Sequence, residues 1–371
     1  MFNKLLRRHL TTTTTPVSRL QLSTNQLLPP AALMVGCAFL NSEQEAYNVV
    51  KTALNAGITD FDTAPLYNQG KSEHYLGAAV AKLPPHEVER VRIFTKCGRL
   101  LSKGTEQVHT VTNDYTNVGV VQSLEQSMSR LGRRASAQIY GLRIHDPNDS
   151  IERPVDTDEV GVALGEGGAV EALLQMRKNG TIPSIGIGMN TNVETTIDST
   201  SPVGNLPPSL TDGVPAQVVR MLEGMPTDVD PYDEVLLAGG WTLLTQTGLA
   251  ALLTAQHQHI PVSAAGIFST GLLVGNEQYA YQRAPREKVE QTQCWQALAA
   301  EYSIPLPTLA IGFAYLPKCV SRVVVGCGNE KELAMNIEGA ESSSGIPKEV
   351  WDEAFNRGLL GRGLHEHIEF V

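Results

Sequence analysis

Stretches typical of β-strands and stretches typical of α-helices alternate along most of this 371-residue chain, and no other feature constrains its fold as strongly. Between the strand-like runs, apolar residues recur at helical spacing, as in Ala46, Val49, Val50 and Ala53. Strands that alternate with helices pair in parallel, and eight such units close into a barrel. The eight predicted strands are at residues 33–39, 59–67, 90–97, 136–145, 184–189, 234–238, 262–268 and 320–325.

We therefore predict one α/β domain over residues 30–371, folded as a (β/α)8 TIM barrel. The competing fold, an open doubly wound sheet, usually carries a Gly-x-Gly-x-x-Gly turn after its first strand, and none opens this chain. Residues 101–116, 147–168 and 192–233 are enlarged loops after predicted strands three, four and five. We interpret these loops as lids or variable substrate loops, or as solvated insertions.

The first 29 residues form an N-terminal extension before the barrel. No acidic residue occurs before Glu43, whereas Lys4, Arg7, Arg8 and Arg19 are basic. This composition fits a disordered extension on a cytoplasmic enzyme, which is our interpretation, or alternatively a mitochondrial targeting segment.

The remaining composition argues against several classes of protein. A formal net charge of −10 and a pI near 5.4 make nucleic acid an unexpected partner. Five widely spaced cysteines without a Cys-x-x-Cys pair predict neither a disulfide framework nor a metal site. The uncharged stretch 235–259 is long enough to cross a membrane, but Gly239, Gly240 and several polar residues interrupt it. We expect no membrane span, and a monomer or a small homo-oligomer.

Four titratable residues are predicted to meet at the mouth of the barrel. Asp62, Lys96 and His145 each close a predicted strand, and Tyr67 follows Asp62 in the loop beyond it. An ammonium beside a phenol stabilises the phenolate, and a carboxylate holds the ammonium in place. An imidazole can orient a substrate oxygen. Their shared position predicts an acid–base site.

The segments FDTAPLY, SEHYLG, FTKCGR, IHDP, SIGIGMN and VVVGCGNEKELAMN resemble those of the aldo-keto reductase superfamily. More narrowly, LLAGGWTLL followed by AAGIFSTGLL is similar to the aldose 1-dehydrogenase branch, which includes galactose, fucose and arabinose dehydrogenases and pyridoxal-dehydrogenase-like proteins. The resemblance runs from Leu33 to Leu360. It implies that Tyr67 is the general acid or base, that Lys96 and Asp62 tune it, and that His145 orients the substrate.

The resemblance also implies a nicotinamide cofactor, NAD or NADP. Three groups of residues then hold its nicotinamide, its pyrophosphate and its adenosine half: Met189 and Asn190; Phe268, Ser269, Thr270 and Gly271; Gly326, Gly328, Asn329 and Asn336. The branch commonly has Arg-Tyr where this chain has Gly240 and Trp241. We expect Trp241 to stack on the nicotinamide or the sugar, with packing at the barrel mouth as the alternative.

Glu332 favours NAD over NADP. It lies four residues before Asn336, where NADP-dependent relatives often have an arginine for the 2′-phosphate. A carboxylate there would repel that phosphate.

The resulting prediction is an NAD(P)-dependent oxidoreductase of carbohydrate metabolism that oxidises an aldose at C1 to a lactone. The alternative with the same fold is a reductase of small aldehydes, pyridoxal-type substrates included. A remote alternative from another class is a non-catalytic, channel-associated subunit that binds nucleotide.

Overall fold

Eight parallel strands close into a barrel in the computed structural model of this chain, as the alternation predicted. The structure describes residues 19–24, 26–103, 109–147, 157–191, 214–226, 229–280, 282–361 and 364–371. In order around the barrel, the strands are β2 (Leu33–Gly36), β3 (Asp60–Asp62), β4 (Arg92–Cys97), β7 (Ile139–His145), β8 (Ser184–Asn190), β9 (Glu234–Ala238), β10 (Val262–Ala265) and β13 (Val320–Gly326).

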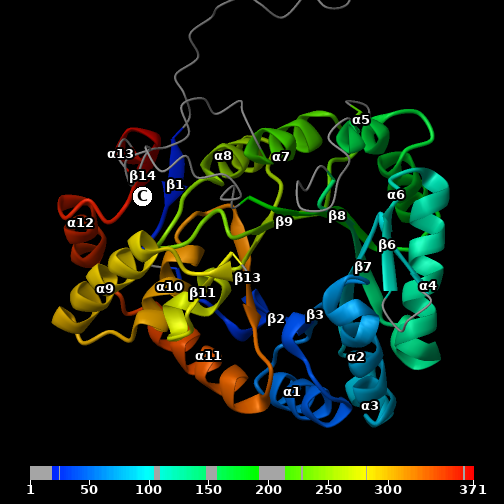
Figure 1. Ribbon diagram of the computed structural model, residues 1–371, viewed down its shortest axis with the longest axis horizontal. Coiled ribbons are helices and arrows are strands. Elements are labelled where there is room, and N and C mark those ends of the chain that lie inside the picture. Colours follow the sequence, from blue (N-terminus) through cyan, green and yellow to red (C-terminus); the bar gives the residue numbers. More distant parts are fainter. Residues whose placement is uncertain are drawn as a thin grey trace, which may run out of the picture.

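Helices surround the strands (Figure 1). They are α1 (Glu43–Asn55), α2 (Lys71–Ala81), α3 (Pro85–Val88), α4 (Asn117–Ser136), α5 (Glu159–Leu164), α6 (Ala169–Lys178), α7 (Val214–Glu223), α8 (Leu249–His257), α9 (Arg286–Glu301), α10 (Leu306–Tyr315), α11 (Glu330–Ser343), α12 (Lys348–Asn356) and α13 (Leu364–His367). Helix α1 shows why they form where they do. The Ser42 side chain accepts a hydrogen bond from the Glu45 amide and caps the helix. Val49 and Val50 are buried against the barrel.

The enlarged loops contain more regular structure than the sequence predicted. After β4, the chain forms an antiparallel hairpin of β5 (Arg99–Lys103) and β6 (His109–Asn113). Helix α5 lies within 147–168, of which residues 148–156 fall outside the described part. Within 192–233, residues 192–213 also fall outside it, but α7 follows and supplies the helix between β8 and β9. A second short hairpin, β11 (Gln278–Tyr279) with β12 (Gln282–Arg283), follows β10.

The last part of the expected N-terminal extension is structured. Strand β1 (Leu20–Leu22) pairs in parallel with β14 (Ile368–Phe370), so the two ends of the described chain lie side by side (Figure 1). Both Leu20 and Leu22 are buried. The Ser23 amide donates to the Leu316 carbonyl, just before β13, which places β1 at the amino-terminal end of the barrel. The expectation of disorder therefore does not hold for Leu20–Leu22, while the targeting alternative stays a prediction. Residues 1–18 lie outside the described residues.

We expect Leu22→Ala to lower the free energy of unfolding by about 2–5 kcal/mol, the usual cost of truncating a buried leucine. The Leu22 side chain is 1% exposed. Leu27→Ala removes the same atoms from a side chain that is 75% exposed and serves as the matched control. Urea unfolding measures both variants. Equal stability of the two would show that β1 contributes nothing to the core.

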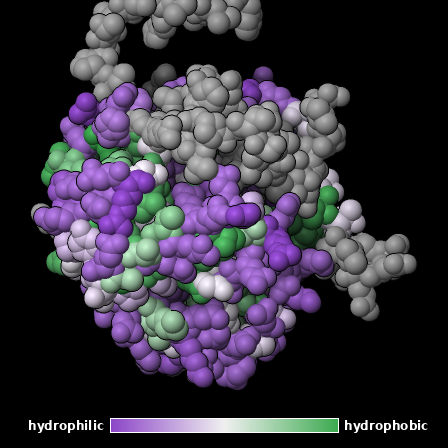
Figure 2. Space-filling model, turned by 60° about the vertical axis from the view of Figure 1, so that its left-hand side comes forward, coloured by the Kyte–Doolittle hydropathy of each residue, from purple (hydrophilic) through white to green (hydrophobic). Residues whose placement is uncertain are grey.

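The coloured surface seen in Figure 2 is mostly hydrophilic, and its apolar residues lie in small separate groups. Within the described ranges, no single helix has the length and hydropathy to cross a membrane, and α9 with α10 would do so only as a pair bent by 97°.

Candidate active site

The four titratable residues predicted to act together lie at the carboxyl ends of three neighbouring strands. Asp62 is the last residue of β3, Lys96 is the next to last of β4, and His145 is the last of β7. Tyr67 begins the short 3-10 turn Tyr67–Gly70 that follows β3. Because these strands are adjacent in the barrel, the four side chains gather at one side of its mouth.

Asp62 and Lys96 form a buried ion pair. The Lys96 Nζ donates to both Asp62 carboxylate oxygens at 2.8 Å and to the Thr63 carbonyl at 2.9 Å. Lys96 is only 1% exposed. Burial lowers the pKa of the Lys96 ammonium, and the Asp62 carboxylate opposes that shift. The ammonium is thus held in a fixed place with little water around it.

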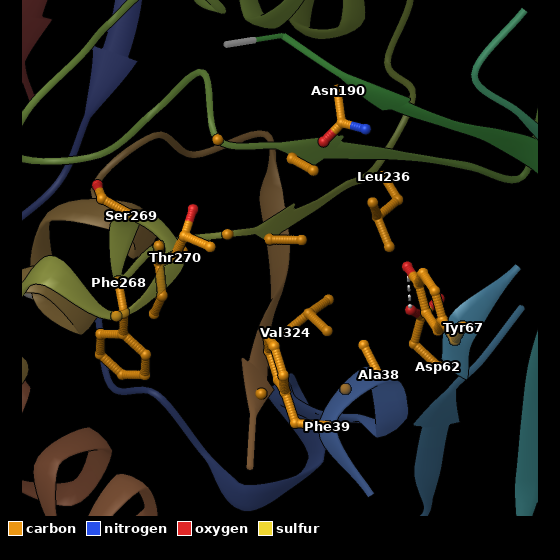
Figure 3. Close-up of a pocket in the computed structure, with 18 of the residues that line it drawn as sticks. Ala38, Phe39, Asp62, Tyr67, Asn190, Leu236, Phe268, Ser269, Thr270 and Val324 are labelled. Carbon is orange, nitrogen blue, oxygen red and sulfur yellow. Dashed lines mark hydrogen bonds between the residues drawn. The ribbon is translucent and has the colours of Figure 1, made fainter. Parts of the chain in front are cut away.

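The Tyr67 ring lies directly against this pair. Its hydroxyl donates to Asp62 Oδ2 at 3.4 Å (dashed line in Figure 3), and Lys96 Nζ lies 4.5 Å from the ring centroid. The ring also makes an edge contact with His145, with centroids 5.9 Å apart. A phenol placed beside an ammonium and a carboxylate is suited to give up and recover a proton.

His145 is buried and uncharged at neutral pH. Burial lowers the pKa of His145 well below its ordinary value, and the positive charges of Arg99 and Lys96 lower it further. Its Nε2 lies 3.4 Å from Asp146 Oδ2, and its Nδ1 has no hydrogen-bond partner among the described residues. A neutral imidazole can still donate one hydrogen bond to a substrate oxygen.

These residues line one side of a cavity of about 700 Å³. Figure 3 shows Tyr67 and Asp62 on one side of it and Phe268, Ser269 and Thr270 on the opposite side. Nine of the residues predicted to hold a cofactor line the same cavity: Met189, Asn190, Phe268, Ser269, Thr270, Gly271, Gly326, Gly328 and Glu332. The four titratable residues Asp62, Tyr67, Lys96 and His145, called the tetrad below, and most of the predicted cofactor residues thus belong to one continuous site.

Asp146 fixes Asn190 at the wall of this cavity. The Asn190 amide nitrogen of the backbone donates to Asp146 Oδ1 at 2.7 Å, and its side-chain nitrogen donates to Oδ2 at 2.9 Å. The Asn190 side chain points into the cavity (Figure 3). Asp146 itself has a positive φ of 44°, which is uncommon for a residue other than glycine. This local strain is offset by the two bonds that hold Asn190.

The opposite end of the cavity is a tight turn. Ser269, Thr270 and Gly271 have successive positive φ angles of 51°, 59° and 103°. All three residues line the cavity, and the Ser269 hydroxyl donates to Thr242 Oγ1 at 3.3 Å. Such small polar residues suit the pyrophosphate of a dinucleotide, and the Asn190 amide suits a carboxamide. The residues present therefore fit a nicotinamide dinucleotide.

Glu332 is fixed at the loop that follows β13. Its carboxylate oxygens accept hydrogen bonds from the Gly328 amide and from Asn329 Nδ2, both at 2.8 Å. Glu332 lines the cavity, and its negative charge is therefore held at the wall. That Glu332 distinguishes the free ribose hydroxyl of NAD from the 2′-phosphate of NADP stays a prediction.

Three predicted cofactor residues lie outside the cavity wall. Trp241 is 3% exposed, its Nε1 donates to the Phe313 carbonyl at 3.2 Å, and its ring stacks on Phe313. The packing alternative therefore holds for Trp241, because α10 supplies the partner that a buried indole N–H needs. Asn329 caps α11, accepting from the Lys331 and Glu332 amides. Asn336 Nδ2 donates to the Gly326 carbonyl at 3.3 Å. These two asparagines hold the loop.

The sequence prediction missed Arg143, Arg99 and Asp146. Arg143 is two residues before His145 on β7, so alternation along the strand places both side chains on the same face. Asp146 directly follows His145, and both Asp146 and Arg99 line the cavity. The strand period was the signal that could have placed Arg143 inside the barrel.

Residues 33–353 match the sequence model of the Aldo/keto reductase family. A pyridoxal 4-dehydrogenase from Microbacterium luteolum is 28% identical over 348 residues, which cover 86% of this chain and 90% of that protein. A D-threo-aldose 1-dehydrogenase from a Pseudomonas species is 28% identical over 340 residues, covering 86% and 89%.

Solved structures share the fold at lower identity. An aldo-keto reductase from Bacillus halodurans, in its holo form, superposes with a TM-score of 0.62 at 16% identity, covering 96% of this chain and 97% of that one. A glycerol dehydrogenase from Gluconobacter oxydans gives 0.58 at 18% identity, covering 96% and 94%.

Proposed function

The chain belongs to the aldo/keto reductase family of oxidoreductases, and from this premise we propose that it oxidises a small aldose at C1 to the lactone, with NAD as the preferred cofactor. The observation that carries the proposal is the contact of Tyr67 with the buried Asp62–Lys96 pair at one side of the cavity. The likeness to a D-threo-aldose 1-dehydrogenase over most of the chain supports the choice of substrate class.

In this direction, each residue of the site has one task. Tyr67 takes the proton of the C1 hydroxyl, and the Lys96 ammonium stabilises the phenolate that receives it. Asp62 keeps Lys96 in place through two 2.8 Å hydrogen bonds. His145 donates to the substrate oxygen and orients it. A nicotinamide cofactor held by Asn190 and by residues 268–271 would supply the acceptor for the hydride from C1.

A second candidate is reduction of small aldehydes, including pyridoxal-type substrates. The same residues serve it, with Tyr67 as the acid that protonates the new alcohol. The likeness to a pyridoxal 4-dehydrogenase over 86% of the chain supports a pyridoxal-type substrate, and the direction of the reaction is left to the experiment.

A panel of aldoses and aldehydes tests both candidates, with turnover followed by nicotinamide absorbance in each direction and with each cofactor. Oxidation of aldoses with release of a lactone supports the first proposal. Turnover of aldehydes alone favours the second. If cofactor binds but no substrate in the panel reacts, a nucleotide-binding module that acts through partner proteins becomes the better interpretation.

We expect NAD to be preferred over NADP by roughly tenfold or more in kcat/KM. Two like charges about 4 Å apart repel by about 1 kcal/mol in water and by about 4 kcal/mol near a protein surface. The Glu332 carboxylate, held by Gly328 and Asn329, would oppose a 2′-phosphate in this way. Glu332→Arg should therefore shift the preference towards NADP.

Glu338→Arg is the matched control, since it makes the same change of charge at an exposed position farther along α11. It should leave the ratio of the two kcat/KM values unchanged. Preference of the unmodified enzyme for NADP would show that Glu332 does not select the cofactor, while hydride transfer itself would stand.

A further inference from the structure

Arg143 is a fully buried cation between two carboxylates inside the barrel. Its Nη1 donates to Asp62 Oδ1 at 2.6 Å, and its Nε donates to Glu234 Oε1 at 2.9 Å. Arg143 is 0% exposed and Glu234 is 2% exposed. A buried guanidinium is costly unless it is paired on more than one side, and here both sides are paired.

The interior of this barrel differs from the usual packing of branched apolar side chains. Four apolar residues, Met34, Phe94, Leu236 and Val324, form a separate small cluster there. The Arg143 guanidinium lies 4.7 Å from the centroid of the Phe94 ring. Its place in the interior is therefore set by an aromatic face as well as by carboxylates.

Glu234 is itself anchored from the other side. Its Oε2 accepts a hydrogen bond from Ser263 Oγ at 3.1 Å and pairs with Arg322 Nη1 at 3.3 Å. Arg322 Nε also pairs with Asp60 Oδ2 at 3.1 Å. A continuous set of charged contacts thus runs from Asp60, at the start of β3, through Glu234 and Arg143 to Asp62 at its end.

Arg143 and Lys96 share one carboxylate oxygen. Lys96 Nζ lies 2.8 Å and Arg143 Nη1 lies 2.6 Å from Asp62 Oδ1. Two carboxylates, Asp62 and Glu234, face two cations, Lys96 and Arg143, so these four formal charges sum to zero. Without Arg143, Asp62 would keep Lys96 and Glu234 would keep Arg322, but the surroundings of Asp62 would lose one positive charge.

We propose that Arg143 is a positioning residue of the reaction: by holding Asp62 and balancing its charge, it sets the pH range over which Tyr67 takes up and releases its proton. The proposal rests on the proposed function, in which Tyr67 is the acid or base. It adds a residue that touches neither substrate nor reacting atoms and acts through Asp62.

The other groups around the pair support this assignment. His145 on β7 is uncharged, because burial and nearby cations lower its pKa well below the ordinary value. The thiol of Cys37 faces Asp62 and Lys96, and burial raises its pKa well above the ordinary value, so it is also uncharged. Asp146 faces Lys96, but its carboxylate lies 3.8 Å from Arg99, which balances its charge. Arg322 is paired with Asp60 and Glu234.

The test compares the pH dependence of kcat/KM for oxidation in four forms of the enzyme. In Arg143→Met, the loss of a positive charge makes it harder for Tyr67 to lose its proton, so the midpoint of the rising limb should move up by about one pH unit or more. Glu234→Gln changes the charge in the opposite direction, because it removes a negative charge, and it should move the midpoint down. Arg143→Met/Glu234→Gln removes both charges and should return it close to the wild-type value.

Arg143→Lys keeps the charge and should keep the midpoint, whatever it does to the maximal rate. A purely structural role predicts a different pattern: lower rates in all variants with one common midpoint. That pattern, or equal displacement of the single and double variants in the same direction, overturns the proposal. If Arg143→Met does not fold, Glu234→Gln and Arg143→Met/Glu234→Gln still isolate the effect of Arg143, because the two differ at this residue alone and the double variant should have the higher midpoint.

A second measurement separates this proposal from the proposed function. NMR of ring-labelled tyrosine, with the Tyr67 signal assigned by its absence in Tyr67→Phe, follows ionisation of Tyr67 without any substrate. The same order of midpoints should appear there: Glu234→Gln below wild type and Arg143→Met above it. If the substrate panel fails but this order is found, the role of Arg143 stands. If the enzyme turns over but the order is absent, only the role of Arg143 is rejected.

Discussion

Tyr67→Phe is expected to lower kcat by about 10²–10⁴-fold, the usual contribution of a positioned acid or base. The change removes the one hydroxyl that contacts Asp62 from the cavity side and leaves the ring against Lys96 and His145. Packing is therefore retained, and the dissociation constant of the cofactor should change by less than about twofold. Steady-state kinetics and fluorescence titration with NAD measure the two quantities.

Tyr47→Phe is the matched control, because Tyr47 is a partly buried tyrosine on α1 that packs against the hydrophobic core. It should leave kcat unchanged. A loss below about fivefold in Tyr67→Phe would remove Tyr67 from the proposed mechanism and would direct attention to another proton carrier in the cavity.

Lys96→Met is expected to lower kcat by at least about 10²-fold while costing less stability than the loss of a buried charge usually does. Removing one member of a buried ion pair costs about 3–5 kcal/mol when the partner is left alone. Here Asp62 keeps the Arg143 guanidinium at 2.6 Å, so its carboxylate is not left unpaired. Activity falls because nothing then stabilises the Tyr67 phenolate.

Urea unfolding and steady-state kinetics together check this prediction. Lys51→Met, which removes a partly exposed lysine paired with Glu87, is the control; its effect on stability should stay within about 1 kcal/mol and its kcat should not change. A Lys96→Met enzyme that keeps more than a tenth of wild-type kcat contradicts the assigned role. A stability loss above about 5 kcal/mol would show that Arg143 does not compensate.

The barrel could be predicted because its strands leave a clear mark in the sequence. Several contain a short apolar run, as β13 does at residues 323–325, and stretches with apolar residues at helical spacing lie between them. Helices α7 and α10 are harder to recognise in the sequence. Helix α10 is buried on nearly all sides, from Leu306 to Ala314, so it lacks the polar face that reveals a helix. Helix α7 has buried Val218, Met221 and Leu222 at helical spacing, but it lies at the end of a long polar stretch.

The tetrad could be predicted from position alone, since parallel strands bring their carboxyl ends together. The way its members are paired could not. Alternation in LRIH places Arg143 on the same face as His145, but it does not show that Arg143 lies fully buried between Asp62 and Glu234, which are distant in sequence. Likewise, Trp241 could stack on a ligand or pack on α10, and only the position of the Phe313 carbonyl decides between the two.

Pairing of β1 with β14 joins residues that are 348 positions apart in the sequence. During synthesis, β1 precedes every strand of the barrel, and β14 is made only after the last barrel strand, β13. Leu20 and Leu22 therefore cannot pair with Ile368 and Phe370 until β14 has been made, whereas local βα units can assemble earlier. The docking of β1 beside β14 therefore follows synthesis of the barrel strands that lie between them in the sequence.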